Sequence, residues 1–206
     1  MGLYVVTAEF PGKSHIDVAT AAIEGGALII QYREKDTSSR KLLETAGKLR
    51  ELTSKADVKL IINDRVDIAL AIRADGVHLG QDDLTLEAAK NIMGYDYIIG
   101  ISATNFDEAL AAAKDGADYI GLGPIYPTPS KDDAAPPIGL EGLSAVAEAI
   151  NIPVVAIGGI TIDNVEEVVM AGADAIAVIS AVAAAEDMAG AARSLNGIIK
   201  RTKMQR

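Results

Sequence analysis

The sequence contains no cysteine among its 206 residues. Disulfide bonds and cysteine-ligated metals are therefore excluded, and nothing indicates an oxidising compartment. Aromatic residues are also scarce, at 4%, although half of all residues are hydrophobic. The apolar content is mostly Ala, Ile, Val and Leu, which suits helices packed tightly on a parallel sheet.

Long apolar stretches and a positive charge balance are missing as well. No stretch approaches the ~18 consecutive apolar residues of a membrane-spanning helix, and no signal peptide is visible. Asp and Glu outnumber Lys and Arg by 29 to 19, which gives a formal net charge of −10. This charge argues against nonspecific binding of nucleic acid or of an anionic membrane surface. We therefore expect a cytoplasmic protein whose partners are small molecules, with a homodimer as a reasonable assembly.

Eight short apolar runs alternate with helical segments along the whole chain. Strict alternation of this kind predicts a parallel sheet, and eight repeats predict a closed (β/α)8 TIM barrel. The length lies near the lower limit of about 200 residues for such a barrel, so residues 1–206 are expected to form one domain. The alternative is an open, doubly wound sheet. The expected strands are 3–7, 27–33, 58–63, 76–79, 97–101, 118–123, 153–157 and 174–179.

A weak internal repeat supports closure of the barrel. Similar Gly/Ala/Asp triplets precede the fourth, sixth and eighth strands, namely Ala74-Asp75-Gly76, Gly116-Ala117-Asp118 and Gly172-Ala173-Asp174. Gly25-Gly26-Ala27 precedes the second strand in the same way. The repeating unit is therefore two strand–helix pairs. Glycines at these places are expected to end helices with positive φ, which marks this end of the barrel as structural.

The stretch Gln31-Tyr32-Arg33-Glu34-Lys35 places polar residues at the end of the second strand. Side chains alternate along a strand, so Gln31, Arg33 and Lys35 are expected on one face. Taken alone, the stretch is more simply a solvated charge run. However, polar residues also follow the other strands from the third to the eighth, and the loops after the strands form the working face of such a barrel.

Two further sub-sites follow from the strand ends. Gly158-Gly159 and Ile179-Ser180 follow the seventh and eighth strands, where barrels often bind phosphate. Asp64 and Asp83 follow adjacent strands and suit Mg²⁺, which takes few protein carboxylates besides substrate phosphate oxygens. For each pair there is a simpler interpretation, as ordinary tight turns and as helix N-caps respectively.

The cations Arg33, Lys35 and Lys131 complete the set, because together with Mg²⁺ they could hold a diphosphate. A phosphate site opposite a diphosphate site suggests two phosphorylated substrates. It also suggests a transfer in which pyrophosphate leaves, rather than a hydrolysis. Residue types and spacing name neither substrate.

These segments resemble the thiamine phosphate synthase family, and the similarity covers essentially the whole chain. The residues that carry it are 31–35 (QYREK), 63–65 (NDR), 78–83 (HLGQDD), 123–131 (GPIYPTPSK), 157–160 (IGGI) and 178–180 (VIS). The resemblance implies a (β/α)8 barrel that joins hydroxymethylpyrimidine diphosphate to a thiazole phosphate. The products would be thiamine phosphate and pyrophosphate.

The resemblance also implies roles for individual residues. On the pyrimidine side, Gln31 would contact the ring, Ser102 would lie beside the reacting centre, and the diphosphate would be held by Arg33, Lys35, Asn63 and Lys131. Mg²⁺ would bind Asp64 and Asp83. On the thiazole side, the contacts would come from Thr128 and Ser130, and the phosphate contacts from Gly158, Ile179 and Ser180. Arg33, Lys35, Ser102 and Lys131 would be the catalytic residues.

The implied mechanism is a dissociative substitution, in which pyrophosphate leaves before the thiazole nitrogen attacks. It needs no side-chain nucleophile. The chain departs from the family at Tyr32, where a smaller apolar residue is usual, at Thr104-Asn105, which replaces His-Thr, and at Ser130, which replaces Thr. The missing histidine argues against a thiazole tautomerase of the same family.

Three alternatives stay open at this point. They are the tautomerase, a non-catalytic sensor of thiamine precursors, and an aldolase- or epimerase-type phosphate barrel. The last would need a Schiff-base lysine or a pair of acid–base residues inside the barrel, and the only lysine available within a strand is Lys59. The proline-rich segment 124–138 is expected to act as a lid over the site.

Overall fold

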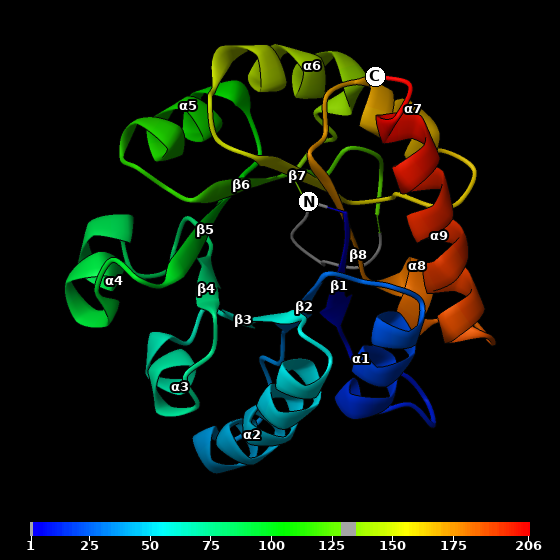
Figure 1. Cartoon of the computed structure of the whole chain (residues 1–206). Coiled ribbons are helices and arrows are strands. Elements are labelled where there is room, and N and C mark those ends of the chain that lie inside the picture. The colour runs from blue at the N-terminus through cyan, green and yellow to red at the C-terminus, as the bar shows by residue number, and fades with distance from the viewer. Residues whose placement is uncertain (1, 129–134) are drawn as a thin grey trace.

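The computed structural model describes residues 2–128 and 135–206. Within them, eight parallel strands pair in sequence order and close into one barrel, with helices around the outside (Figure 1). Val5 of β1 pairs with Val178 of β8, which closes the ring. The strands are β1 (Leu3–Thr7), β2 (Ile29–Tyr32), β3 (Lys59–Asn63), β4 (Gly76–Leu79), β5 (Ile98–Ala103), β6 (Tyr119–Leu122), β7 (Val154–Ile157) and β8 (Ala175–Val178). The predicted (β/α)8 barrel is confirmed.

The helices follow the strands as the alternation predicts. They are α1 (His15–Glu24), α2 (Ser39–Lys55), α3 (Val66–Ala71), α4 (Leu86–Met93), α5 (Phe106–Lys114), α6 (Gly139–Ala149), α7 (Val165–Met170), α8 (Ser180–Ala183) and α9 (Met188–Lys203). Among the described helices, none is both long enough and apolar enough to cross a bilayer.

Local capping explains where several helices begin. Ser14 caps α1 in a capping box with Asp17, and Ser38 and Thr85 cap α2 and α4 through their side-chain oxygens. Two helices, rather than one, follow the last strand. The chain forms the short α8, and then Asp187 starts α9 by accepting a hydrogen bond from the Gly190 backbone N–H.

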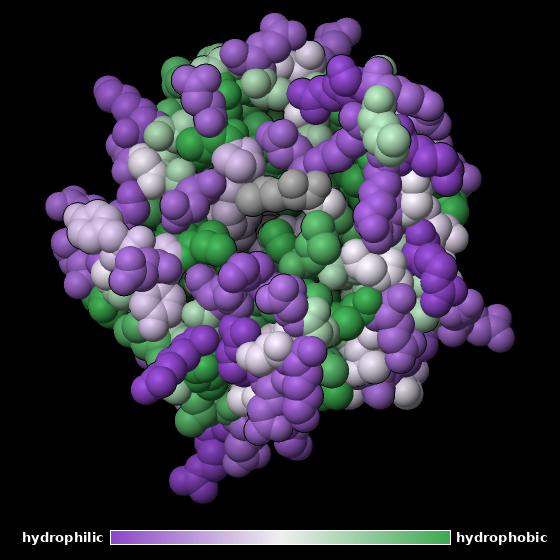
Figure 2. All heavy atoms as spheres, in the orientation of Figure 1, coloured by the Kyte–Doolittle hydropathy of each residue, from purple (hydrophilic) through white to green (hydrophobic). Residues whose placement is uncertain are grey.

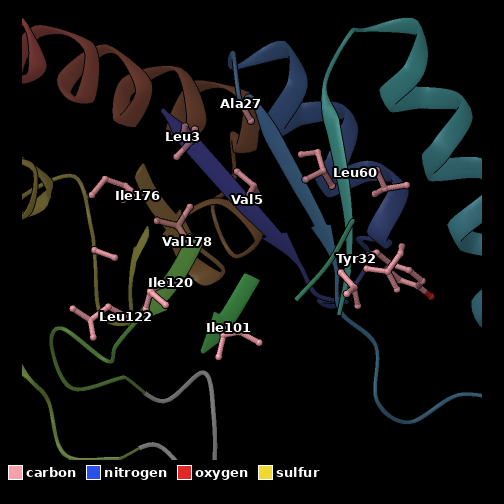
Figure 3. Packing of buried hydrophobic residues seen from close by; sticks show 14 of the residues in the cluster. Leu3, Val5, Ala27, Tyr32, Leu60, Ile101, Ile120, Leu122, Ile176 and Val178 are labelled. Carbon is pink, nitrogen blue, oxygen red and sulfur yellow. The ribbon is translucent and has the colours of Figure 1, made fainter. Parts of the chain in front are cut away.

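Alternation along the strands separates two apolar layers. Leu3 and Val5 point outward into the large cluster between barrel and helices, part of which Figure 3 shows, whereas Tyr4 and Val6 point inward. The inner cluster is smaller and includes Tyr119. Each fully buried aliphatic side chain contributes roughly 1.5–3 kcal/mol, so the outer layer dominates the stability of the fold. In Figure 2, hydrophilic side chains surround the rim and hydrophobic ones gather near the barrel axis.

The predicted quarter-barrel repeat has a structural counterpart at the N-terminal ends of the strands. Asp75, Asp118 and Asp174 each precede an even-numbered strand and accept a hydrogen bond from a backbone N–H near the start of the preceding odd-numbered strand. The donors are Leu60, Ile99 and Val154, at 2.9, 2.8 and 2.9 Å. Gly26, Gly116 and Gly172 have positive φ before their strands, as expected. The same expectation is wrong for Gly76, which is the first residue of β4, and Arg73 instead adopts a positive φ of 52° after α3.

The unit that begins at β1 has a different arrangement, because no aspartate precedes β2. Here Asn196 of α9 donates through Nδ2 to the backbone oxygens of Gly25 and Gly26, at 3.4 and 2.9 Å. A side chain at Gly26 would clash with this amide, 2.4 Å from its Nδ2. In Figure 1, α9 lies alongside α1, so the C-terminal helix covers the start of the barrel.

Candidate functional site

A cavity of about 580 Å³ opens among the loops that follow the strands. This volume is in the range of small-molecule sites. Most of the residues predicted from sequence line it, namely Arg33, Lys35, Asn63, Asp64, Asp83, Ser102, Thr128, Gly158, Ile179 and Ser180. Gln31 lines a smaller cavity of about 50 Å³ that shares Arg33, Asn63 and Ser102 with the large one. The predicted residues Ser130 and Lys131 lie outside the described residues, as does the central part of the predicted lid.

The end of β2 supplies the cationic wall, as the alternation predicted. Gln31 points into the barrel, and Arg33 and Lys35 line the cavity beyond it. Glu34 instead accepts from the Asp36 backbone N–H at 2.8 Å and lies 3.3 Å from His15 Nε2. Among residues 2–128 and 135–206, no carboxylate lies within 4.0 Å of either cation's nitrogens. The two positive charges are therefore available to an anionic ligand.

His15 had no role in the sequence prediction, and the structure gives it one. The ring is buried, and its Nδ1 lies 2.8 Å from Thr7 Oγ1 while its Nε2 faces Glu34. Tyr32 meets the ring edge-on, with centroids 4.8 Å apart. This contact puts Tyr32 in the helix layer outside the barrel, so the departure from the family at this position does not alter the lining of the cavity. His15 anchors the segment that carries the two cations.

Asp64 and Asp83 come together at the ends of β3 and β4, and neither is a helix N-cap. Arg65 stands at the N-cap of α3 and Thr85 at that of α4. Asp64 adopts φ of 58°, a left-handed conformation that Asp tolerates better than most residues. Asp83 accepts from the Gly80 N–H at 2.7 Å. The simpler interpretation of these acids as caps is therefore wrong.

The electrostatics of this acid pair suit a divalent cation. Burial, together with the hydrogen bond and charge of Asp83, raises the pKa of Asp64 to about 6, although Lys35 and Arg33 oppose the shift. The two carboxyl groups thus repel each other at a half-buried position. Mg²⁺ prefers such oxygen ligands, so Asp64 and Asp83 fit the ion that the sequence predicted.

Glycines shape the opposite wall of the cavity. Gly158 and Gly159 have φ of 99° and 67°, and a Cβ on Gly158 would lie 2.6 Å from Pro124 Cα. The backbone of the loop after β6 approaches this closely because Tyr126 N–H donates to Gly158 O at 3.0 Å. Beside this turn, α8 begins directly after Ile179. Only glycine permits this packing, which brings backbone close to any ligand phosphate.

A hydrogen-bonded row of side chains crosses the barrel beneath the cavity. Gln31 Nε2 donates to Tyr4 Oη at 2.6 Å, and Tyr4 Oη lies 3.0 Å from Tyr119 Oη. His78 bridges onward, with Nδ1 2.9 Å from Tyr119 Oη and Nε2 2.9 Å from Ser102 Oγ. Burial raises the pKa of Tyr4 to about 12 and that of Tyr119 well above its usual range, so both phenols stay protonated.

Sequence reasoning missed the two tyrosines and gave His78 no catalytic role. The only available signal was alternation, which puts Tyr4 and Tyr119 on inward faces. Their partnership joins positions 115 residues apart, which no local pattern reveals. After β5, Thr104 and Asn105 both bond Glu108 at the start of α5, so the departure from His-Thr serves helix capping here.

Comparisons with known proteins agree with this geometry. The sequence matches the family model described as thiamine monophosphate synthase over residues 3–182. It is 53% identical over 203 residues to a thiamine-phosphate synthase of Chloroflexus aurantiacus, covering 98% of this chain and 94% of that protein. It is 49% identical to the thiamine-phosphate synthase of Moorella thermoacetica, covering 98% and 97%.

A solved structure gives the same result in three dimensions. The thiamine phosphate pyrophosphorylase from Pyrococcus furiosus superposes with a TM-score of 0.92 at 46% identity, covering 98% of this chain and 96% of that one.

Proposed function

The chain belongs to the thiamine monophosphate synthase family, and on that premise we propose how the mouth of its barrel carries out the reaction. The protein is a thiamine-phosphate synthase, which condenses a pyrimidine diphosphate with a thiazole phosphate in thiamine biosynthesis. The observation that carries the residue-level proposal is the polarity of the cavity. Its β2–β4 side gathers two cations and three carboxylates, those of Asp64, Asp82 and Asp83, and its β7–β8 side is a glycine turn next to a helix start.

The diphosphate of the pyrimidine substrate binds on the β2–β4 side. Arg33 and Lys35 contact its oxygens, and Asn63 donates from the end of β3. Asp64 and Asp83 hold Mg²⁺, which when bound supplies positive charge to the leaving pyrophosphate. Charge that is already in place before the bond breaks lowers the barrier to a dissociative substitution, because the site need not reorganise. Lys131 joins these cations by resemblance alone.

The pyrimidine ring lies deeper, between Gln31 and Ser102. Gln31 lines the small cavity and not the large one, and Ser102 lines both, whereas Lys35, Asp64 and Asp83 line only the large one. This depth supports contacts of Gln31 and Ser102 with the ring. The thiazole phosphate lies opposite, with its phosphate against the backbone of Gly158 and the start of α8 at Ile179 and Ser180. Thr128 lines the cavity between the two regions and contacts the thiazole, together with Ser130.

Turnover with hydroxymethylpyrimidine diphosphate, thiazole phosphate and Mg²⁺ tests the proposal, with thiamine phosphate read as fluorescent thiochrome. We expect a metal-dependent product, and we expect Arg33→Gln to lower kcat by roughly 10²-fold. Arg40→Gln is the matched control, because Arg40 is exposed in the first turn of α2. Equal activity of the two variants would remove Arg33 from the mechanism.

The remaining outcomes separate the alternatives. Binding of both ligands without product would favour the precursor sensor, and no binding of the pyrimidine diphosphate would favour the thiazole tautomerase. The aldolase-type alternative has lost its candidate lysine, because Lys59 is exposed and pairs with Asp75 at 2.9 Å, at the structural end of the barrel. Cytoplasmic location and a homodimer stay predictions from the sequence.

A further inference from the structure

The hydrogen-bonded row beneath the cavity is buried, and two glycines leave space for its rings. Tyr4 and Tyr119 are 1% and 2% exposed, and Gln31 is 5% exposed. Two glycines make room for the rings, since a Cβ at Gly100 would lie 2.1 Å from Tyr119 Cζ, and one at Gly121 would lie 2.7 Å from His78 Cε1. Side chains from five strands thus meet in a space that larger residues at these two positions would fill.

With the Gln31 amide oriented as in the structure, all the protons in this row point the same way. An amide nitrogen only donates and a phenol carries one proton, so Tyr4 accepts from Gln31 and passes its own proton towards Tyr119. Tyr119 then donates to His78 Nδ1, because both phenols stay protonated. The imidazole proton consequently lies on Nε2 and points at Ser102 Oγ. Ser102 accepts from His78, and its own proton is directed into the cavity.

The same reasoning joins the two ends of the row. If the Gln31 amide turned over, its oxygen would accept from Tyr4, and every donor along the row would reverse. Ser102 would then donate to His78 and present a lone pair to the cavity. Gln31 and Ser102 therefore always show opposite hydrogen-bonding character to a ligand between them. A ring with a donor at one edge and an acceptor further along matches this arrangement, as an aminopyrimidine does.

We propose that Tyr4, Tyr119 and His78 are positioning residues, which set the direction of the Ser102 hydroxyl from the Gln31 end of the row. This inference rests on the proposed function, because Ser102 is the member that meets substrate. A ligand that contacts Gln31 fixes the orientation of its amide. Through the row, that orientation determines whether Ser102, on the far side of the barrel interior, donates or accepts a hydrogen bond. It thereby couples recognition of the ring to the group beside the reacting carbon.

The test is a double-mutant cycle between Tyr119→Phe and Ser102→Ala. Tyr119→Phe keeps the ring stacked on His78, at a centroid distance of 5.4 Å, and removes only the hydroxyl. We expect it to lower kcat at least about tenfold and to leave the KM for the thiazole phosphate unchanged. In the Ser102→Ala background the same change should have an effect below about twofold, because its target is gone. Tyr4→Phe should behave like Tyr119→Phe.

Tyr32→Phe is the matched control, since Tyr32 is equally buried but faces the helix layer, where its hydroxyl bonds Thr45. Its kcat should stay within about twofold of wild type. Equal losses from Tyr119→Phe in both backgrounds, or no loss beyond that of the control, would overturn the inference.

Two further measurements keep the outcome decisive. Circular dichroism melts identify any variant that fails to fold, in which case Tyr4→Phe replaces it in the cycle. The dissociation constant for the pyrimidine diphosphate is measured by calorimetry for the same set. If wild type makes no thiamine phosphate, the proposed function fails, and the cycle in binding still decides the inference. Non-additive binding losses support the row, whereas additive losses refute it.

Discussion

Replacing Asp64 by Asn is expected to stabilise the metal-free protein while removing its activity. The carboxyl group is half-buried against Asp83, and this raises its pKa from 3.8 to about 6. A raised pKa of an acid means that the folded state favours the protonated form. Above pH 6 the ionised Asp64 therefore costs folding free energy, and this cost disappears as the pH falls from about 6 to about 4.

The size of the effect follows from the shift. About two pKa units correspond to ~3 kcal/mol without screening, and the solvent that reaches the carboxyl reduces this to roughly 1–2 kcal/mol. For a chain of this length that difference corresponds to an increase in Tm of about 3–6 °C. We therefore expect Asp64→Asn to melt above wild type at pH 8 in EDTA, and close to wild type at pH 4.5.

Magnesium should reverse the order of the melting temperatures, so that wild type melts above Asp64→Asn. Wild type gains about 2.7 kcal/mol when Mg²⁺ is present at 100 times its dissociation constant, whereas the variant has lost a ligand and gains less. Scanning calorimetry with EDTA or MgCl₂ measures both effects. Asp96→Asn is the control, because Asp96 is exposed in the loop between α4 and β5 and should respond to neither condition. An Asp64→Asn protein that melts with wild type at pH 8 in EDTA would refute the reasoning.

Three other substitutions test separate features. Gly158→Ala should lower the free energy of unfolding by at least about 2 kcal/mol in urea titrations, because φ is 99° and the new Cβ meets Pro124. It should also raise the KM for the thiazole phosphate. An unchanged urea midpoint of unfolding would contradict this prediction. Asp75→Asn should cost about 1–3 kcal/mol at pH 7. Burial raises the pKa of Asp75, but hydrogen bonds from Leu60 and two cations lower it overall, so the advantage of wild type should shrink as pH falls below about 4 in acid melts. An advantage that stays constant as the pH falls below 4 would count against this prediction. Gly47→Ala should stabilise α2 by about 0.5–1 kcal/mol, since a Cβ there meets nothing within 4 Å. A lower Tm than wild type would refute this prediction.

Features set by neighbouring residues could be predicted from the sequence. Ser14 and Ser38 satisfy helix N–H groups three residues away, so their caps are visible in the sequence itself. The cationic face of β2 follows from alternation, because Gln31 and Arg33 are two positions apart. The closed barrel follows from counting strand–helix pairs.

The role of the acid pair could not be settled by the same means. An aspartate just before a helix has the same sequence pattern whether it caps the helix or faces a ligand. The backbone decides, through the left-handed φ at Asp64 and the capping hydroxyl of Thr85 two residues after Asp83. Neither is visible before the chain is folded.

The interior row escaped prediction because its members are individually ordinary. Tyr4 lies among apolar residues of β1, and Tyr119 does so in β6, so each has the pattern of a core aromatic. Only closure of the barrel brings the two hydroxyls together. The sequence pattern therefore predicted the polar residues at the strand ends better than the tyrosines inside the barrel.

The hydrogen bonds at the structural end of the barrel also suggest an order of events during synthesis. The three aspartate contacts join residues 15, 19 and 20 positions apart, so each can form soon after its own segment leaves the ribosome. Short separations of this kind make contacts fast to form. The first unit is different, because the Asn196 contact to Gly26 spans 170 residues. The first part of the barrel to be synthesised is thus the last to gain its stabilising contact. A nascent chain stopped before α9 would lack the hydrogen bond from Asn196 to Gly26 before β2.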